Sequence, residues 1–145
     1  MSNKTPKVHH NTIFSYCNDV ATMRHFYTDL LGLEETYFDD EQGWLTYSSG
    51  TLQVVFVRAK SPLPVTSDWG KQPSYQEGKL EIPSWVIQID YADFDATIER
   101  IKSDASVTLL DGNVRSPRDG HKSFWLRDPM ETTIELYASN ESVEA

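Results

Sequence analysis

The sequence has a single cysteine, few basic residues and no long apolar run. The lone cysteine, Cys17, excludes an internal disulfide and a zinc site built from several cysteines. No stretch reaches the roughly 18 apolar residues of a membrane span, and no apolar run typical of a secretory signal follows the N-terminus. With 13 basic against 22 acidic residues, the net charge of -9 disfavours nucleic acid and anionic membranes as partners. We therefore expect a cytoplasmic protein.

Catalytic motifs with strong sequence signatures are also missing. The chain has no nucleophile elbow, no phosphate-binding glycine loop and neither a His-X-His nor a His-Glu-X-X-His spacing. Its 145 residues are 39% hydrophobic and 24% charged, which is typical of one folded domain. Function must then be inferred from the order of the elements and from a few side chains.

The first part of the chain predicts a strand, a helix and three more strands. Asn18 or Asp19 is the expected N-cap of the helix, and Gly32 supplies its left-handed end. Between them, apolar residues recur at helical spacing. The strands are expected near residues 8–17, 35–38, 44–48 and 52–58.

A connector rich in proline and glycine follows at residues 59–81. Its aromatic residues, Trp69 and Tyr75, either cover a site as a lid or pack against a second subunit. The strand and helix order then repeats, with a helix capped by Asp93. The repeated strands are expected near residues 84–91, 106–110, 121–127 and 132–137. Residues 1–7 and 139–145 are expected to be flexible.

This order predicts an α+β domain over residues 8–138, with modules 8–58 and 82–138. Each module has the order βαβββ, and the two four-stranded antiparallel sheets are expected to cup a central cavity. Thr12, Phe14 and Tyr16 would share the cavity face of the first strand, because side chains alternate along a strand. Cys17, Ile134 and Leu136 would face the helices as core. His25 and His121 are expected at the surface or at a sheet edge.

Two segments resemble the vicinal oxygen chelate superfamily, which includes glyoxalase I, extradiol dioxygenases and bleomycin-resistance proteins. One runs from Asp19 to Leu33, with a Phe-Tyr pair and a closing Leu-Gly-Leu; the other combines Asp128-Pro129 with Ile134-Glu135-Leu136. The resemblance covers residues 8–138 and implies the paired-sheet fold and a homodimer. Whether the subunits exchange halves through the connector is open.

The resemblance also implies where a divalent metal would bind: to one residue from the first and the fourth strand of each half. These positions hold Thr12, a residue near Gln53 to Val55, Val86 and Glu135. Only Glu135 is a standard ligand, so no metal cofactor is expected. His10 is open as a non-standard ligand. The family also has glycine where this chain has Glu131, which indicates a different turn geometry before Glu135.

We therefore predict a small-molecule site that is aromatic, with Glu135 as its one carboxylate. Aromatic residues alternating on strands also suit a core or a dimer interface, so that alternative stays open. The predicted ligand-binding residues are Glu135, Trp125, Tyr137, Phe14, Tyr16, Thr12, Gln53 and Gln88.

Three functions are compatible with these residues. The first is metal-independent binding of a small organic molecule, with sequestration of a cationic or aromatic compound as in bleomycin-resistance proteins. The second is a metal-dependent lyase, isomerase or dioxygenase of the glyoxalase type. The third is a domain that mediates protein contacts only.

Overall fold

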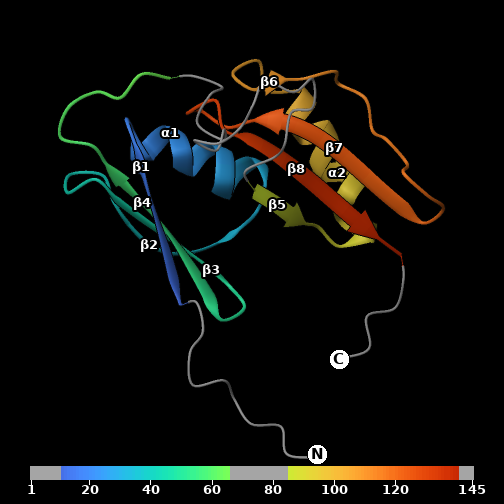
Figure 1. Ribbon diagram of the computed structural model, residues 1–145, viewed down its shortest axis with the longest axis horizontal. Coiled ribbons are helices and arrows are strands. Elements are labelled where there is room, and N and C mark those ends of the chain that lie inside the picture. The colour runs from blue at the N-terminus through green and yellow to red at the C-terminus, as the bar shows by residue number, and fades with distance from the viewer. Residues whose placement is uncertain (1–10, 66–84, 141–145) are drawn as a thin grey trace, which may run out of the picture. The chain divides into compact units, whose positions relative to one another are not determined.

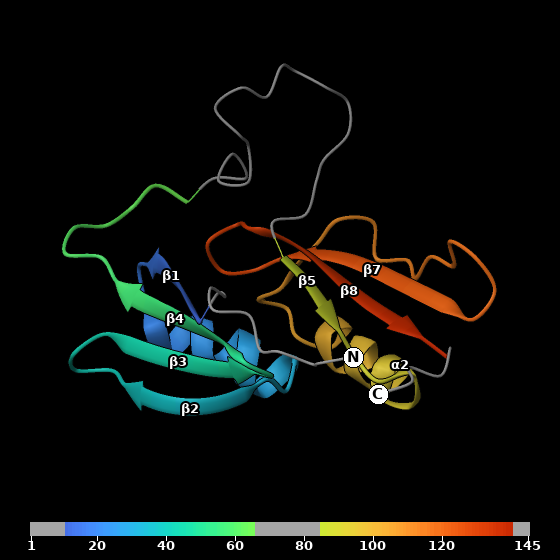
Figure 2. The same cartoon turned by 60° about the horizontal axis from the view of Figure 1, so that its bottom comes forward.

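The computed structural model describes residues 11–65 and 85–140. The chain divides into two compact units, Met1–Leu63 and Pro64–Ala145. Each unit has one four-stranded sheet with a helical segment on one of its faces (Figure 1 and Figure 2). In the described stretches, no helix has the length and the hydropathy needed to cross a membrane.

The two units repeat the predicted order of strand, helix and three strands. The α+β prediction is thereby confirmed, and β4 and β7 have the predicted bounds. The first unit contains β1 (Thr12–Cys17), α1 (Val20–Arg24), the π-helix η1 (His25–Leu30), β2 (Glu34–Asp39), β3 (Trp44–Ser49) and β4 (Leu52–Arg58). The second contains β5 (Trp85–Gln88), α2 (Tyr91–Lys102), β6 (Thr108–Leu109), β7 (His121–Arg127) and β8 (Thr133–Ser139).

Both sheets are mixed, so the expectation of purely antiparallel sheets is wrong. The strand orders are β1-β4-β3-β2 and β5-β8-β7-β6, with β1 parallel to β4 and β5 parallel to β8. The reason lies in the connection: a helix between two strands returns the chain, so β1 and β2 run in the same direction. Because β3 is antiparallel to β2 and β4 is antiparallel to β3, β4 runs in the same direction as β1.

The first helix begins where predicted but changes its winding. Asp19 is its N-cap, accepting from the Ala21 N–H at 3.0 Å, and Gly32 ends the segment with a φ of 79°. From His25 the chain follows a π-helix, which the sequence did not indicate. Its neighbouring residues Phe26 and Tyr27 are both buried in the core, with ring centroids 4.8 Å apart.

The second helix begins earlier than predicted. Its N-cap is Asp90 and not Asp93, which lies in the first turn of α2. The peptide N–H of Asp93 donates to the Asp90 carbonyl at 2.9 Å, so the chain turns as soon as β5 ends at Gln88. The carboxylate of Asp93 still suits this position, because it faces the positive end of the helix dipole.

The buried residues follow the predicted alternation. Cys17, Ile134 and Leu136 are fully buried, as expected for side chains that face the helices. In the first unit the core joins α1 and η1 to β3 and β4, and in the second it joins α2 to β7 and β8. The central residues are Met23, Tyr27, Tyr47 and Phe56 in the first unit and Phe94, Ile98, Phe124 and Leu126 in the second.

The turn between β7 and β8 is held by a buried carboxylate. Asp128 is 3% exposed, and its Oδ1 accepts from the peptide N–H groups of Met130 (2.8 Å) and Thr132 (3.0 Å). Glu131 adopts a φ of 64°, the left-handed conformation that glycine favours. The prediction of a different turn geometry is therefore wrong. The turn has the positive φ that the family's glycine would adopt, and here a glutamate adopts it at a steric cost.

Replacing Glu131 with glycine should stabilise the protein. Glycine has no Cβ to clash at positive φ, so Glu131→Gly should raise the free energy of unfolding by about 1 kcal/mol. Urea denaturation would measure it. Glu131→Ala is the control: it also loses the glutamate's contacts with Thr108 and Arg127 but keeps the Cβ, so it should not stabilise. Equal effects of both substitutions would contradict backbone strain.

Candidate functional site

One face of the sheet formed by β5 to β8 is turned away from α2. Lys122 lies on the helix side, where its Nζ donates to Asp95 of α2 at 2.9 Å. The odd-numbered residues of β7 and β8 therefore point to the other side, together with alternate residues of β5. This face, called the Glu135 face below, consists of Val86, Gln88, His121, Ser123, Trp125, Arg127, Thr133, Glu135 and Tyr137.

Glu135 lies at the middle of this face. Its direct neighbours are Trp125 on β7 and Val86 on β5. Ser123 Oγ donates to Glu135 Oε2 at 2.7 Å, and Trp125 Nε1 donates to Ser123 Oγ at 3.2 Å. Ser123 is 5% exposed, whereas Trp125 and Glu135 are half-buried. The predicted pair of Glu135 and Trp125 is thus brought together, through a serine that the sequence analysis did not single out.

Tyr137 is held by a histidine on the same face. Its hydroxyl forms a hydrogen bond with His121 Nδ1, and the two rings lie 5.6 Å apart between centroids. His121 is 3% exposed, so its prediction as a surface or edge histidine is wrong. Both His121 and Ser123 could have been predicted from the alternation of side chains along a strand. Residues 121, 123 and 125 share one face, which places the two beside Trp125.

The predicted residues of the first unit share one face of their own sheet. Thr12 pairs with Gln53 across β1 and β4, and Phe14 and Tyr16 are 61% and 66% exposed. Phe14 meets Trp44 of β3 edge-to-face, with centroids 6.0 Å apart. Large aromatic surface thus stays open in this sheet. That these residues line one cavity with Glu135 stays a prediction.

The residues at the family's metal positions pair within each ladder, Thr12 with Gln53 and Val86 with Glu135. They offer a hydroxyl, an amide and one carboxylate, while valine offers no donor. A divalent transition metal needs several imidazole, carboxylate or thiolate donors, so this set does not fit one. Over residues 11–65 and 85–140, no three His, Cys, Asp or Glu side chains gather closely enough to hold a metal. His10 lies outside the described residues, as do Trp69 and Tyr75.

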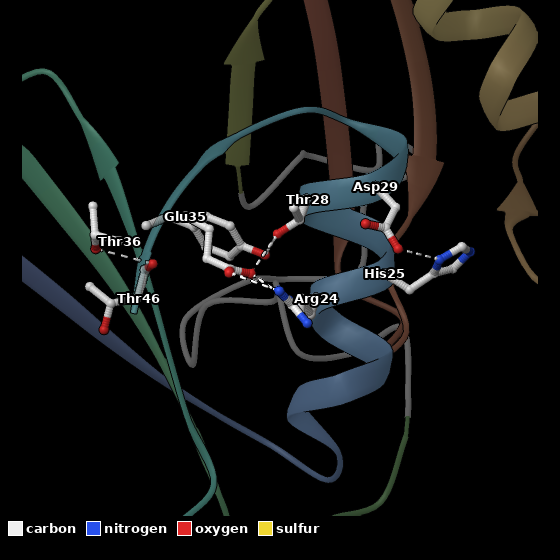
Figure 3. Close-up of polar contacts among 8 residues, drawn as sticks. Arg24, His25, Thr28, Asp29, Glu35, Thr36 and Thr46 are labelled. Atoms are coloured by element: carbon white, nitrogen blue, oxygen red, sulfur yellow. Dashed lines mark hydrogen bonds and ion pairs between the residues drawn. The ribbon is translucent and has the colours of Figure 1, made fainter. Parts of the chain in front are cut away.

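A second polar cluster joins the first helix to β2 and β3 (Figure 3). Arg24 donates from Nε and Nη2 to the two carboxylate oxygens of Glu35, at 2.7 and 3.1 Å. Thr28 Oγ1 adds a bond to Glu35 at 3.1 Å and lies 2.7 Å from the Tyr47 hydroxyl. Burial raises the pKa of Tyr47 above its usual value, so that hydroxyl stays neutral. Because both oxygens of Glu35 already have donors, the cluster anchors η1 rather than offering a binding site.

His25 lies beside this cluster on the surface, as predicted. Its Nδ1 is 3.0 Å from Asp29 Oδ2, and its side chain is 47% exposed. Figure 3 shows the pair pointing away from Glu35, on the other side of the helix. We assign it no role in ligand binding.

The chain is similar to known proteins in both sequence pattern and fold. A family model described as "Glyoxalase/Bleomycin resistance protein/Dioxygenase superfamily" matches residues 7–136. No curated protein matches the chain. The solved fosfomycin resistance protein FosX from Listeria monocytogenes is 16% identical, with a TM-score of 0.59 and 97% of each chain covered. A lactoylglutathione lyase from Agrobacterium tumefaciens is also 16% identical, with a TM-score of 0.55, covering 92% of this chain and 95% of that one.

A mutant of the Listeria FosX was solved in complex with Mn(II) and 1S,2S-dihydroxypropylphosphonic acid. It is 17% identical to this chain, with a TM-score of 0.59, and the match covers 94% of this chain and 93% of that one. At these identities the structural similarity shows a shared fold.

A double-mutant cycle would test the contact of His121 with Tyr137. Tyr137→Phe removes one hydrogen bond of a buried imidazole and should lower the free energy of unfolding by about 1–2 kcal/mol. Combined with His121→Phe, the cycle should give a coupling energy of about 1 kcal/mol. Denaturant unfolding measures each variant. Tyr16→Phe is the control, since the Tyr16 ring is 66% exposed and its hydroxyl should contribute little. Additive effects would show that the contact does not couple the two side chains.

Proposed function

Because the chain belongs to the glyoxalase, bleomycin resistance protein and dioxygenase superfamily, we propose that it binds a small organic molecule with a cationic or aromatic group at the Glu135 face. The proposal includes no divalent metal at the family's usual position. It also includes a homodimer, which the resemblance seen in the sequence implies, and a cytoplasmic location.

The pairing of Glu135 with Trp125 is the observation that supports this function most. A half-buried carboxylate attracts a cation more strongly than an exposed one, because less water screens it. An indole ring beside it adds a cation–π contact or a stacking surface. Tyr137 and Gln88, which are neighbours across β8 and β5, supply polar groups at the next position of the face. The face thus places Val86 and the rings of Trp125 and Tyr137 beside several polar groups.

The charge of the whole chain favours a cation as well. A net charge of -9 raises the local concentration of cationic molecules near the protein and repels anionic ones. The exposed aromatic residues Phe14 and Tyr16, with Thr12 and Gln53, stay candidate ligand contacts on the sheet of the first unit.

Removing the charge of Glu135 should abolish the preference for cations. In a thermal-shift screen of cationic and neutral aromatic compounds, we expect cationic ones to stabilise the wild-type protein. Glu135→Gln should weaken their binding about tenfold or more, because a charge-assisted contact is lost. Glu34→Gln, at an exposed position of β2, is the matched control and should bind as the wild type does. A screen in which no cationic or aromatic compound stabilises the protein would refute the proposal.

A metal-dependent enzyme is the second candidate, supported by the Mn(II) complex of the FosX mutant with the same fold. In that case a metal would act as a Lewis acid on the substrate. We expect untagged protein to carry well under one equivalent of zinc, nickel, manganese or iron per chain, because the donor set is too poor. Elemental analysis by mass spectrometry tests this. Near-stoichiometric metal that is lost in Glu135→Gln would favour the enzyme instead.

A further inference from the structure

From the hydrogen bonds around Ser123 we infer that the group bound at Glu135 is a compact ammonium, a primary or N-methylated amine, and not a guanidinium. Ser123 is then the residue that determines this specificity. The inference rests on the proposed function and names the ligand class for it.

Ser123 uses one acceptor position of Glu135 Oε2, so a ligand that binds both carboxylate oxygens must share Oε2 with the hydroxyl. The hydroxyl has a single proton, which it donates to Glu135 Oε2 at 2.7 Å. None of the donors in the described residues reaches Oε1 within hydrogen-bond distance. An ammonium can bind through one oxygen, whereas a guanidinium binds most strongly as a fork to both. The free oxygen therefore suits the ammonium better.

The same serine also determines which part of the Trp125 ring a ligand can contact. The indole Nε1–H donates to Ser123 Oγ at 3.2 Å, so this donor is already used. A ligand consequently meets the π-electrons of the ring and not its N–H. A cation beside an aromatic ring and one carboxylate oxygen is a combination that recognises ammonium groups. The hydroxyl cannot rotate toward a ligand without giving up its bond to Glu135.

The chain's own guanidinium groups on this side give a further indication. Arg115 lies over the Trp125 ring, with its Cζ 6.0 Å from the centroid, yet it pairs with Asp111. Arg127, two residues after Trp125 on β7, has its Nε 3.9 Å from Glu131 Oε2. Within the described part of the chain, no arginine forms an ion pair with Glu135.

Glu35 of the first unit provides the internal comparison. There Arg24 uses both carboxylate oxygens, at 2.7 and 3.1 Å, and Thr28 adds a hydroxyl bond of 3.1 Å (Figure 3). A carboxylate can thus accept a guanidinium fork beside a hydroxyl when the hydroxyl bond is long. At Glu135 the serine bond is shorter, 2.7 Å, so Oε2 is a poorer second acceptor.

Three probes with the same ring would test the ligand class: benzylamine, benzylguanidine and benzyl alcohol. Each is titrated into the full-length protein while NMR follows the Trp125 indole N–H, identified by its absence in Trp125→Phe. Benzylamine should bind the wild type about tenfold more tightly than benzylguanidine, because only the guanidinium loses a bond by meeting one oxygen. Benzyl alcohol, which has no charge, should bind most weakly.

Substitution of Ser123 tests the specificity role. Ser123→Ala removes the hydroxyl bond to Oε2. The dissociation constants of benzylamine and benzylguanidine should then agree within about threefold. Ser123→Thr keeps the hydroxyl and should keep the wild-type preference. The ratio of the two dissociation constants is also measured in the wild type. The inference can therefore be tested even if a variant folds poorly.

The outcomes separate the two proposals. Equal binding of both cations to the wild type, or tighter binding of benzylguanidine, would overturn the ammonium inference. If Glu135→Gln then weakened both cations, the proposed function would still stand. If neither cation bound more tightly than benzyl alcohol, the proposed function would fail, and the inference with it.

Discussion

The pairing of β7 with β8 is the interaction on which both the core and the candidate site of the second unit depend. It places Phe124 opposite Leu136 on the helix side, and Trp125 opposite Glu135 on the other side. A slip of one residue would exchange the two faces, so burial of the apolar set also determines the site. The Asp128 carboxylate helps to hold that register, since it binds two peptide N–H groups in the connecting turn.

Two glutamates show how context decides what a carboxylate can do. Glu35 binds a guanidinium and a hydroxyl and thereby joins a helix to a strand. Among the described residues, Glu135 has one serine donor and an aromatic neighbour, and its Oε1 accepts no bond. Composition cannot distinguish them, because both lie on strands among polar and aromatic residues. The difference comes from whether an arginine of the same unit reaches the carboxylate.

The fold was predictable from the sequence because its signals are local. Asp19 and Gly32 mark the ends of the first helical segment by their own chemistry, and the bounds of β7 follow from two-residue alternation. The π-helix was not predictable, since the apolar residues of this segment recur at ordinary helical spacing. The burial of His121 was missed because its partner Tyr137 is distant in sequence. Ser123 has a small side chain whose role arises only through its two hydrogen-bonded neighbours.

The ladder pairing of Thr12 with Gln53 and of Val86 with Glu135 also bears on how such a chain can change by mutation. Replacing Val86 with histidine would give the second unit two donors, still fewer than a tightly held transition metal requires. Further substitutions on the same sheet would have to supply the remaining donors. A metal centre at these positions is therefore several substitutions away, with no single intermediate that binds the ion well. A ligand preference governed by one serine, in contrast, can shift in a single step.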